Sequence, residues 1–549
     1  MEEKIRKAVE EALAHAGASE ASFVVERPGE AAHGDYTTNA AMVAAKQLGQ
    51  NPRELADSLA RRIQDALGAD VERVSVAGPG FINITLSNAA VGFAIAEADA
   101  QGEAWGKGSA LSGQRVSFEY SNPNAFKEMH VGHLMGTIVG EALSRLLENA
   151  GAKIIRDTFG GDVGPNVAKA LWALKKDGVT EPDSAKQIGE AYAAGSKAYE
   201  DDAAAHEQID ALNQDIYAGN DAALMELWQK GREVSMRAFR HLWQRLGTKF
   251  DYELFDSDTG ESGKRLVGDG LKKGIFKESD GAIIYDGEEK GVHTMVFITS
   301  HGTPTYEAKD LGLAFLREEK IPNDRVIIVT GNEQTGRFKT VLAALGELAP
   351  NVAAKTEHVA TGFLRLTSGK MSSREGNVIT GEDIMNDLVA RASEKNPDPL
   401  IAEPVAVGAL KFMVLRQAPG QDIVFDPGKS LSLEGDSGPY LQYALVRAAK
   451  LLSYSSEDAG GGEVPREPYA VERVILHYPE VAARAARELA PNLLASYLLE
   501  LASAWNAFYA SEQVLGSPEE EYKLRVARAF ANTMANGLHA LGIPAPERM

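Results

Sequence analysis

The stretch that decides the fold is Arg115-Val116-Ser117-Phe118-Glu119-Tyr120, followed after a short loop by His130-Val131-Gly132-His133. The first segment has a strand-like pattern, and apolar residues at helical spacing occupy 134–149 before Gly151 stops the pattern. A second strand-like run covers 153–159. The order strand–helix–strand predicts one crossover of a nucleotide-binding sheet. The HVGH segment then lies at a helix N-terminus, where free N–H groups and the helix dipole favour an anion.

Two separated segments together predict a nucleotide site. The imidazoles of His130 and His133 can donate hydrogen bonds to phosphate oxygens, and Gly132 leaves room for a flat base against the backbone. The second segment, flanked by glycines, is Lys370-Met371-Ser372-Ser373-Arg374. Its cations and hydroxyls are typical of a mobile clamp for a polyphosphate. One HxGH alone is weak evidence, but the pair in this order resembles the ATP site of a class I aminoacyl-tRNA synthetase.

The composition is that of a globular protein, and a chain of 549 residues is too long for one hydrophobic core, so we expect about three or four domains. No run approaches the ~20 apolar residues that span a bilayer, and the N-terminus lacks a signal-peptide core. We therefore expect a cytoplasmic protein without membrane contact. The absence of cysteine excludes disulfides and thiolate zinc ligands, and the histidines show no metal-ligand spacing, so we expect no zinc.

The net charge of −21 does not by itself favour a nucleic-acid partner. Affinity for phosphates comes from local lysine and arginine, whereas acidic residues gather here at 200–202 and 519–521. Most of this negative charge is explained by solvent-exposed acidic side chains that keep the protein soluble. Any tRNA must therefore approach a face that differs locally from the average.

The pattern along the chain predicts three domains. Residues 1–110 alternate helical and strand-like runs and form an N-terminal α+β domain. Residues 111–429 form an α/β Rossmann-like core, with a buried strand at 324–330 and another strand at 357–366. An Ala-, Asp- and Glu-rich helical insertion interrupts this core at about 175–247. Strand signals vanish beyond Leu431, so 430–549 form an all-helical domain.

Several further segments resemble arginyl-tRNA synthetases over nearly the whole chain. They are Glu119–Met129 before the HVGH, Gly435–Tyr443, the terminal Leu541-Gly542-Ile543, and the N-terminal Gly34-Asp35-Tyr36 and Ala77–Asn83. The resemblance implies an arginine–tRNA ligase, which activates L-arginine with ATP and passes it to the 3′ end of tRNA(Arg). It also implies that the N-terminal domain is an additional tRNA-binding domain and that the C-terminal bundle binds the anticodon.

The resemblance also implies the site residues. An arginine substrate needs a planar carboxylate for its guanidinium and a further acidic or amide group. For arginine the implied residues are Glu119, Asn124, His130, Tyr306, Asp310 and Gln334. The ATP residues are His130, Gly132, His133, Lys370, Met371, Ser372 and Ser373, and the catalytic ones are His130, His133, Lys370, Arg374 and Lys127. For tRNA they are Asp35, Tyr36, Tyr440, Gln442, Tyr443, Arg447, Trp505 and Tyr509.

The sequence departs from the family pattern at two places. Leu134-Met135-Gly136 follows the HVGH where relatives more often have Leu-Arg-Ser, and the second cation of the clamp is Arg374 with Glu375 beside it. Members that lack a loop lysine often carry one just before HVGH, as Lys127 does here. We expect Lys127 and Arg374 to act together on the leaving phosphates, with Mg²⁺ accompanying the ATP.

Other interpretations stay open. The chain could be a class I synthetase for another amino acid, or a catalytically silent tRNA-binding paralogue, although a silent copy would need neither HVGH nor KMSSR. Tyr306 and Asp310 could simply share a helix face, and Trp505 could be a core aromatic at helical spacing. The expected partners are tRNA(Arg), L-arginine and ATP, and we expect a monomer.

Overall fold

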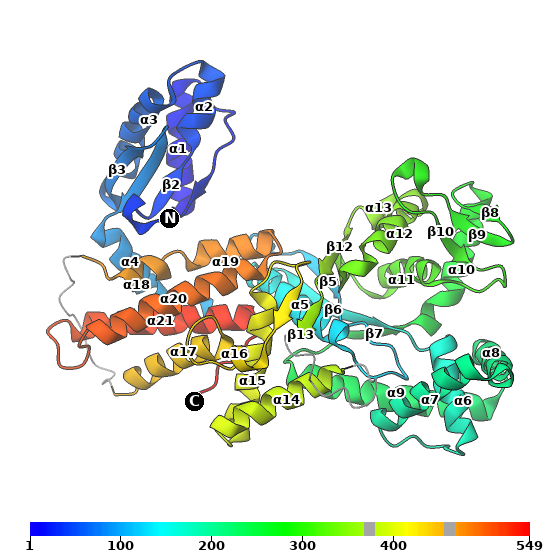
Figure 1. Ribbon diagram of the computed structural model, residues 1–549. Helices are drawn as coiled ribbons and strands as arrows, with labels where there is room; N and C mark the ends of the chain where they lie inside the picture. The colour runs from blue at the N-terminus through cyan, green and yellow to red at the C-terminus, as the bar shows by residue number, and fades with distance from the viewer. Residues whose placement is uncertain (367–378, 455–466) are drawn as a thin grey trace. The chain divides into compact units, whose positions relative to one another are not determined.

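A computed structural model describes residues 1–366, 379–454 and 467–549 of the chain (Figure 1). These residues form two compact units. The first unit comprises Met1–Gly106, Ala444–Val481 and Tyr497–Asn536. The second unit comprises Lys107–Tyr443, Ala482–Ser496 and Gly537–Met549. The whole KMSSR segment, Lys370 to Arg374, lies outside the described residues.

The core of the second unit is a five-stranded parallel sheet with the order β12-β11-β5-β6-β7 (Figure 1). Its strands are β5 (Arg115–Glu119), β6 (Lys153–Gly160), β7 (Tyr252–Phe255), β11 (Arg325–Gly331) and β12 (Thr356–Thr361). The chain starts in the middle, adds β6 and β7 on one side, and later adds β11 and β12 on the other. Ligands of such sheets bind where the order reverses, outside the carboxyl ends of the central strands.

Helix α5 (Val131–Asn149) makes the crossover from β5 to β6 and is buried along most of its length. The helix begins directly after His130, so the predicted helix N-terminus at the HVGH is confirmed. Gly140 brings α5 against the strand end, since a Cβ added there would lie 2.3 Å from the ring of Tyr120. The prediction of a Rossmann-like core is likewise confirmed by the parallel register of β5, β6 and β11.

A second hydrophobic cluster lies between helices and a small antiparallel sheet that the sequence analysis does not predict. The helices are α10 (Asp256–Lys272), α11 (Tyr306–Lys320) and α12 (Thr335–Leu348). The sheet has the order β10-β9-β8, from Met295–Ile298, Ala282–Tyr285 and Lys277–Ser279. This cluster supports the helices that carry Tyr306, Asp310 and Arg337.

The region predicted as a helical insertion, about 175–247, is helical in the structure, but the cluster of helices begins earlier, at Pro165. The cluster consists of α6 (Pro165–Lys176), α7 (Ala185–Asp201), α8 (Ala203–Ala218) and α9 (Ala222–Arg245), around a core of their apolar faces. Asp202 caps the first turn of α8 by accepting hydrogen bonds from the backbone N–H groups of Ala204 and Ala205. Farther along the chain, the second unit also contains α13 (Pro350–Ala353), α14 (Gly381–Lys395), α15 (Pro399–Leu415) and α16 (Pro427–Ser430).

The predicted strand at 357–366 is wrong as one element. It is two strands: β12 ends at Thr361 in the central sheet, and β13 (Leu364–Leu366) pairs instead with β14 (Ile423–Phe425). Gly362 separates them, because the chain passes so close to Gln421 that a Cβ at this glycine would lie 1.9 Å from the Gln421 carbonyl oxygen. The periodicity of side chains cannot reveal such a backbone approach.

The first unit begins with a four-stranded antiparallel sheet of order β1-β2-β4-β3. Its strands are Val25–Glu26, Tyr36–Thr38, Phe81–Leu86 and Val71–Ala77, and they share a core with α1 (Glu2–Ala16), α2 (Ala40–Leu48) and α3 (Pro52–Leu67). Helix α4 (Asn88–Gln101) follows. The predicted α+β composition of the N-terminal region is confirmed.

The region beyond 430 is helical in its described part, as predicted. Its helices are α17 (Gly438–Leu452), α18 (Ala470–Ile475), α19 (Tyr478–Arg487), α20 (Pro491–Ser511) and α21 (Glu520–Ala540). Within residues 1–366, 379–454 and 467–549, no helix is long and apolar enough to cross a bilayer.

Candidate active site

A cavity of about 510 Å³ lies at the carboxyl ends of β5 and β11, where the strand order reverses. Its walls include the ends of both strands, the loop before α5, the first turns of α5, α11 and α12, and the end of β12. All predicted arginine residues and the described ATP residues line it: Glu119, Asn124, His130, Gly132, His133, Tyr306, Asp310 and Gln334. Sheet topology thus brings together residues from distant parts of the chain.

The two histidines form one unit at the N-terminus of α5. His130 is the N-cap residue, and its Nδ1 accepts a hydrogen bond from the backbone N–H of Gly132 at 3.1 Å. The backbone N–H of His130 donates in turn to His133 Nδ1 at 3.4 Å. The rings stack with centroids 3.7 Å apart. Because both Nδ1 atoms accept, each neutral ring carries its proton on Nε2, which can donate to a phosphate oxygen.

Both rings are neutral at physiological pH. Desolvation lowers the pKa of His133 to about 3, helped by the neighbouring His130 and Lys127. Desolvation also lowers the pKa of His130, again with Lys127, while Glu333 opposes the change. A neutral imidazole that only donates a hydrogen bond needs no proton transfer. The pair therefore offers fixed donors beside the positive end of α5, which suits charge that develops on phosphate oxygens.

Glu119 is buried at the end of β5 and is held by an internal cation. Its Oε2 accepts from Arg317 Nη2 at 2.6 Å, and its Oε1 accepts from Asn122 Nδ2 at 2.8 Å. Arg317 also donates to Asp157 at 2.8 Å. Burial raises the pKa of Glu119, and the coulombic attraction of Arg317 opposes that shift. Glu119 is thus a positioned carboxylate whose charge is already partly compensated.

Asp310 lies one turn into α11 and forms an ion pair with Arg337 in the first turn of α12. Arg337 also donates from Nε to Gln334 Oε1 at 2.8 Å. Burial raises the pKa of Asp310 to about 7, against the attraction of Arg337 and together with the repulsion of Glu119. A carboxylate and an amide oxygen therefore converge on one guanidinium inside the cavity.

Asn124 and Tyr306 complete the predicted arginine set at the rim. Asn124 Oδ1 accepts from the backbone N–H of Gly161 at 3.1 Å, which fixes its amide. Tyr306 opens α11 and is 54% exposed. Its ring lies over Lys309, with Nζ 5.3 Å from the ring centroid.

The cavity also contains residues that the sequence analysis misses. Asp256 lines it and accepts from the buried Lys309 Nζ at 2.8 Å, and Arg337 lines it between Asp310 and Gln334. Ser121 and Asn122 line the loop after β5 with φ angles of 73° and 50°. Left-handed backbone at non-glycine residues is uncommon and clusters at functional sites. For Ser121 and Asn122, the only sequence signal was their position in the loop between β5 and the HVGH.

Lys127 does not line the cavity. Its Nζ lies 4.4 Å from the centroid of the Tyr192 ring on α7, so its partner in this structure is an aromatic face of the insertion. The other predicted clamp residues, Lys370, Met371, Ser372, Ser373 and Arg374, lie outside the described residues.

Four of the predicted tRNA residues are buried and have structural partners. Asp35 accepts from Arg473 and from the backbone N–H of Leu86, and the Tyr36 hydroxyl donates to Glu480 at 2.7 Å. Gln442 donates to the carbonyl oxygens of Pro404 and Pro544. Trp505 stacks on Phe530 with centroids 4.4 Å apart. Because the side chains of these four residues are buried and contact other parts of the protein, we do not propose them as tRNA contacts.

The remaining predicted tRNA residues are more accessible. Tyr440 and Tyr443 lie on the first turns of α17, and Tyr443 is 36% exposed. Arg447 lies over the ring of Tyr509, with its guanidinium carbon 4.3 Å from the centroid, and donates to Asn506 at 3.3 Å.

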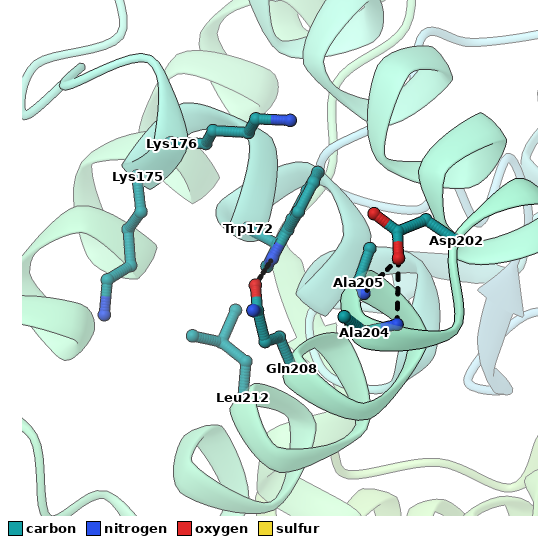
Figure 2. A pocket seen from close by; sticks show the side chains of 8 residues that line it. All are labelled: Trp172, Lys175, Lys176, Asp202, Ala204, Ala205, Gln208 and Leu212. Atoms are coloured by element: carbon teal, nitrogen blue, oxygen red, sulfur yellow. Dashed lines mark hydrogen bonds between the residues drawn. The ribbon is translucent and has the colours of Figure 1, made fainter.

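A second cavity lies within the insertion, between α6 and α8 (Figure 2). The Trp172 indole N–H donates to Gln208 at 2.8 Å, and Asp202 caps α8. Lys175 and Lys176 extend away from each other (Figure 2). Lys175 forms an ion pair with Asp221, outside the residues that line the cavity, and Lys176 lies over the Trp172 ring, so the two lysines do not converge on one ligand position. In the parts of the chain that the structure describes, no three His, Asp or Glu side chains are placed to hold a metal ion.

Known family models match most of the chain, in three separate ranges. Three family models match: "Arginyl tRNA synthetase N terminal domain" over 2–86, "tRNA synthetases class I (R), catalytic domain" over 97–426, and "DALR anticodon binding domain" over 441–549. These ranges cover the N-terminal α+β region, the parallel-sheet core and the C-terminal helices.

Individual relatives agree with the family models. The chain is 31% identical over 570 residues to an arginine–tRNA ligase of Limosilactobacillus reuteri, covering 100% of this chain and 99% of the relative. It is 30% identical over 542 residues to one of Treponema denticola, covering 92% and 91%. Among solved structures, Thermus thermophilus arginyl-tRNA synthetase matches with a TM-score of 0.83 at 27% identity over 99% of both chains. A Plasmodium falciparum arginyl-tRNA synthetase, at 20% identity and a TM-score of 0.80, shares the fold.

Proposed function

This chain belongs to the arginyl-tRNA synthetase family, and we propose that it activates L-arginine with ATP and transfers the arginyl group to the 3′ end of tRNA(Arg). In the first step the arginine carboxylate attacks the α-phosphate of ATP, and pyrophosphate leaves. In the second step a terminal hydroxyl of the tRNA displaces AMP from the arginyl-adenylate. The observation that carries the proposal is the convergence of the histidine pair and the pocket carboxylates on one cavity.

The first step needs orientation and charge stabilisation rather than a protein nucleophile. We assign the Nε2–H groups of His130 and His133 as donors to phosphate oxygens; the backbone N–H groups that both Nδ1 atoms accept support this assignment. Lys370 and Arg374 supply the proposed clamp for the leaving phosphates, with Lys127 as a proposed third cation. Mg²⁺ would accompany ATP, bound mainly by the polyphosphate and water.

Arginine recognition rests on Asp310 and Gln334 for the guanidinium, because their oxygens already converge on the guanidinium of Arg337. Glu119, Asn124 and Tyr306 line the same cavity, and we assign the α-ammonium end to them. An apolar side chain offers no cation and no hydrogen-bond donor to Asp310 or Gln334, so the polar groups of this cavity give it no favourable contact. This chemistry argues against a synthetase for an apolar substrate.

A pH dependence follows from the pKa of about 7 at Asp310. The substrate guanidinium stays charged, so it pairs with the ionised carboxylate. As pH falls from 8 to 6, Asp310 becomes protonated and kcat/KM for arginine should fall by about tenfold. The profile should be measured with ATP saturating. An Asp310→Asn enzyme should lose this dependence along with most of its arginine affinity, whereas a profile that Asp310→Asn leaves unchanged would assign the titration elsewhere.

The family resemblance also implies that arginine is activated only after tRNA has bound. In physical terms, tRNA would populate the binding-competent state of the site. We expect ATP–pyrophosphate exchange with arginine to require tRNA, and tRNA binding to weaken steeply with salt. Comparable exchange rates with and without tRNA(Arg) would disprove this ordered mechanism.

The decisive experiment is an ATP–pyrophosphate exchange assay with each amino acid, run with and without tRNA. Exchange confined to arginine supports the proposed function. Exchange with a different amino acid would indicate another class I specificity. Absence of exchange and of aminoacylation under all conditions would indicate a silent tRNA-binding paralogue. For tRNA contact we retain Tyr440, Tyr443, Arg447 and Tyr509 as candidates, and we expect a cytoplasmic monomer.

A further inference from the structure

Three of the carboxylates that line the arginine cavity are each paired with a cation of the protein itself. Glu119 is paired with Arg317, Asp256 with Lys309, and Asp310 with Arg337. The first two cations are buried, with 2% and 5% of their side chains exposed. Arg317 is further locked by a second carboxylate, Asp157. These two pairs are permanent parts of the wall, because a buried charge that loses its partner is strongly destabilised.

The third pair differs in exposure and in chemistry. The Arg337 side chain is 20% exposed, and Arg337 itself lines the cavity. It holds one carboxylate, Asp310, and one amide oxygen, that of Gln334. Its guanidinium also lies over the ring of Phe338, 4.6 Å from the centroid. A planar cation thus occupies the acidic receptor that an arginine side chain requires.

We propose that Arg337 is an internal placeholder for the substrate guanidinium, which arginine must displace from Asp310 and Gln334 in order to bind. This inference rests on the proposed function, because it takes arginine as the substrate. The exchange replaces one guanidinium–carboxylate pair and one amide contact by the same two contacts. The empty pocket therefore keeps a compensated charge, and the apparent affinity for arginine is reduced by the fraction of time that Arg337 holds the receptor.

The test is Arg337→Met, which keeps an unbranched apolar side chain against Phe338 but removes the competing cation. We expect the KM for arginine in aminoacylation to fall by about tenfold, equivalent to ~1.4 kcal/mol. Arg337 also lowers the pKa of Asp310, so its loss favours protonation of that carboxyl. The gain should therefore be larger at pH 8.5 than at pH 7. Calorimetric titration of arginine into the enzyme–tRNA complex should show the same tightening.

Two further variants complete the design. Arg325→Met removes a guanidinium–carboxylate pair of the same kind outside the cavity, where Arg325 Nε donates to Glu357 at 2.6 Å, and should leave the KM for arginine unchanged. Arg337→Lys keeps the positive charge but loses the planar guanidinium, so its KM for arginine should lie between those of the wild type and Arg337→Met. Thermal unfolding of each variant shows whether it is still folded. If Arg337→Met is unfolded, the KM for arginine of Arg337→Lys is compared with that of the wild type instead.

An unchanged or raised KM for arginine in folded Arg337→Met would overturn the placeholder. A rise in the KM for ATP, with no gain for arginine, would instead place Arg337 on the phosphates. Both results can be told apart from a failure of the proposed function. That failure would be seen in the wild-type enzyme, as an inability to attach arginine to tRNA. A wild type that charges arginine while Arg337→Met binds it no better refutes only this inference.

Discussion

Replacing Asp310 by alanine should raise the arginine concentration needed for half-maximal aminoacylation by about two or more orders of magnitude. The substitution removes the receptor of the substrate guanidinium and leaves Arg337 unpaired in the cavity. Loss of the carboxylate partner of the bound, desolvated substrate guanidinium costs ~3–5 kcal/mol, and each 1.4 kcal/mol corresponds to about a tenfold change in affinity. The residual Arg337 cation would also repel the incoming substrate.

The measurement is the KM for arginine against the KM for ATP in the same enzyme. The ATP value should change little, because Asp310 lies on α11 rather than at the HVGH. Asp269→Ala is the matched control, since Asp269 is an exposed carboxylate of α10 that pairs with Lys272. Arginine kinetics that stay normal in Asp310→Ala would remove this residue from the pocket.

The elements around the histidine motif were predictable because their signals are local. A strand-like run, a short loop, a stripe of apolar residues at helical spacing and a second strand-like run all lie within a few dozen residues, and β5, α5 and β6 follow that pattern. Parallel sheets then gather strand ends at one edge, so Glu119 and the HVGH had to lie near the later strand β11. The Tyr306–Asp310 segment was predicted to belong to the site from the family resemblance, not from the periodicity of its side chains.

The partners of those residues could not be predicted, because ion pairs join positions far apart in the chain. Nothing near Glu119 indicates that Arg317 holds it, and nothing near Asp310 indicates Arg337. Burial likewise depends on the complete fold: Asp35 and Tyr36 follow a turn-like sequence that suits an exposed loop, yet both are buried against Arg473 and Glu480. A motif names residue types, whereas only packing decides which way each side chain faces.

The largest effect on turnover should come from the histidine pair, and His133 permits a test that separates its two atoms. Nδ1 accepts the backbone N–H of His130 and so supports the start of α5. Nε2–H is the proposed donor to ATP. Asparagine can replace the acceptor at the Nδ1 position but does not reach the Nε2 position. Glutamine can reach the Nε2 position but leaves the backbone N–H without its acceptor.

We therefore expect His133→Asn to keep its thermal stability and to lose about 10²–10³-fold in kcat, as when one preorganised donor to a transition-state oxygen is removed. His133→Gln should lose less activity but ~0.5–1.5 kcal/mol of stability, because one hydrogen bond at the helix start is lost. Since desolvation lowers the pKa of His133 to about 3, neither loss should depend on pH between 6 and 8.

The stacked rings should also be coupled. His130 and His133 share one ligand and contact each other, so their substitutions in a double-mutant cycle should be non-additive by ~0.5–3 kcal/mol. Single-turnover adenylate formation in the presence of tRNA measures this directly, because it isolates the phosphate chemistry from product release. Should His133→Asn retain full turnover while His133→Gln loses it, the ring would act through the helix start alone, and phosphate stabilisation would fall to His130 and the KMSSR cations.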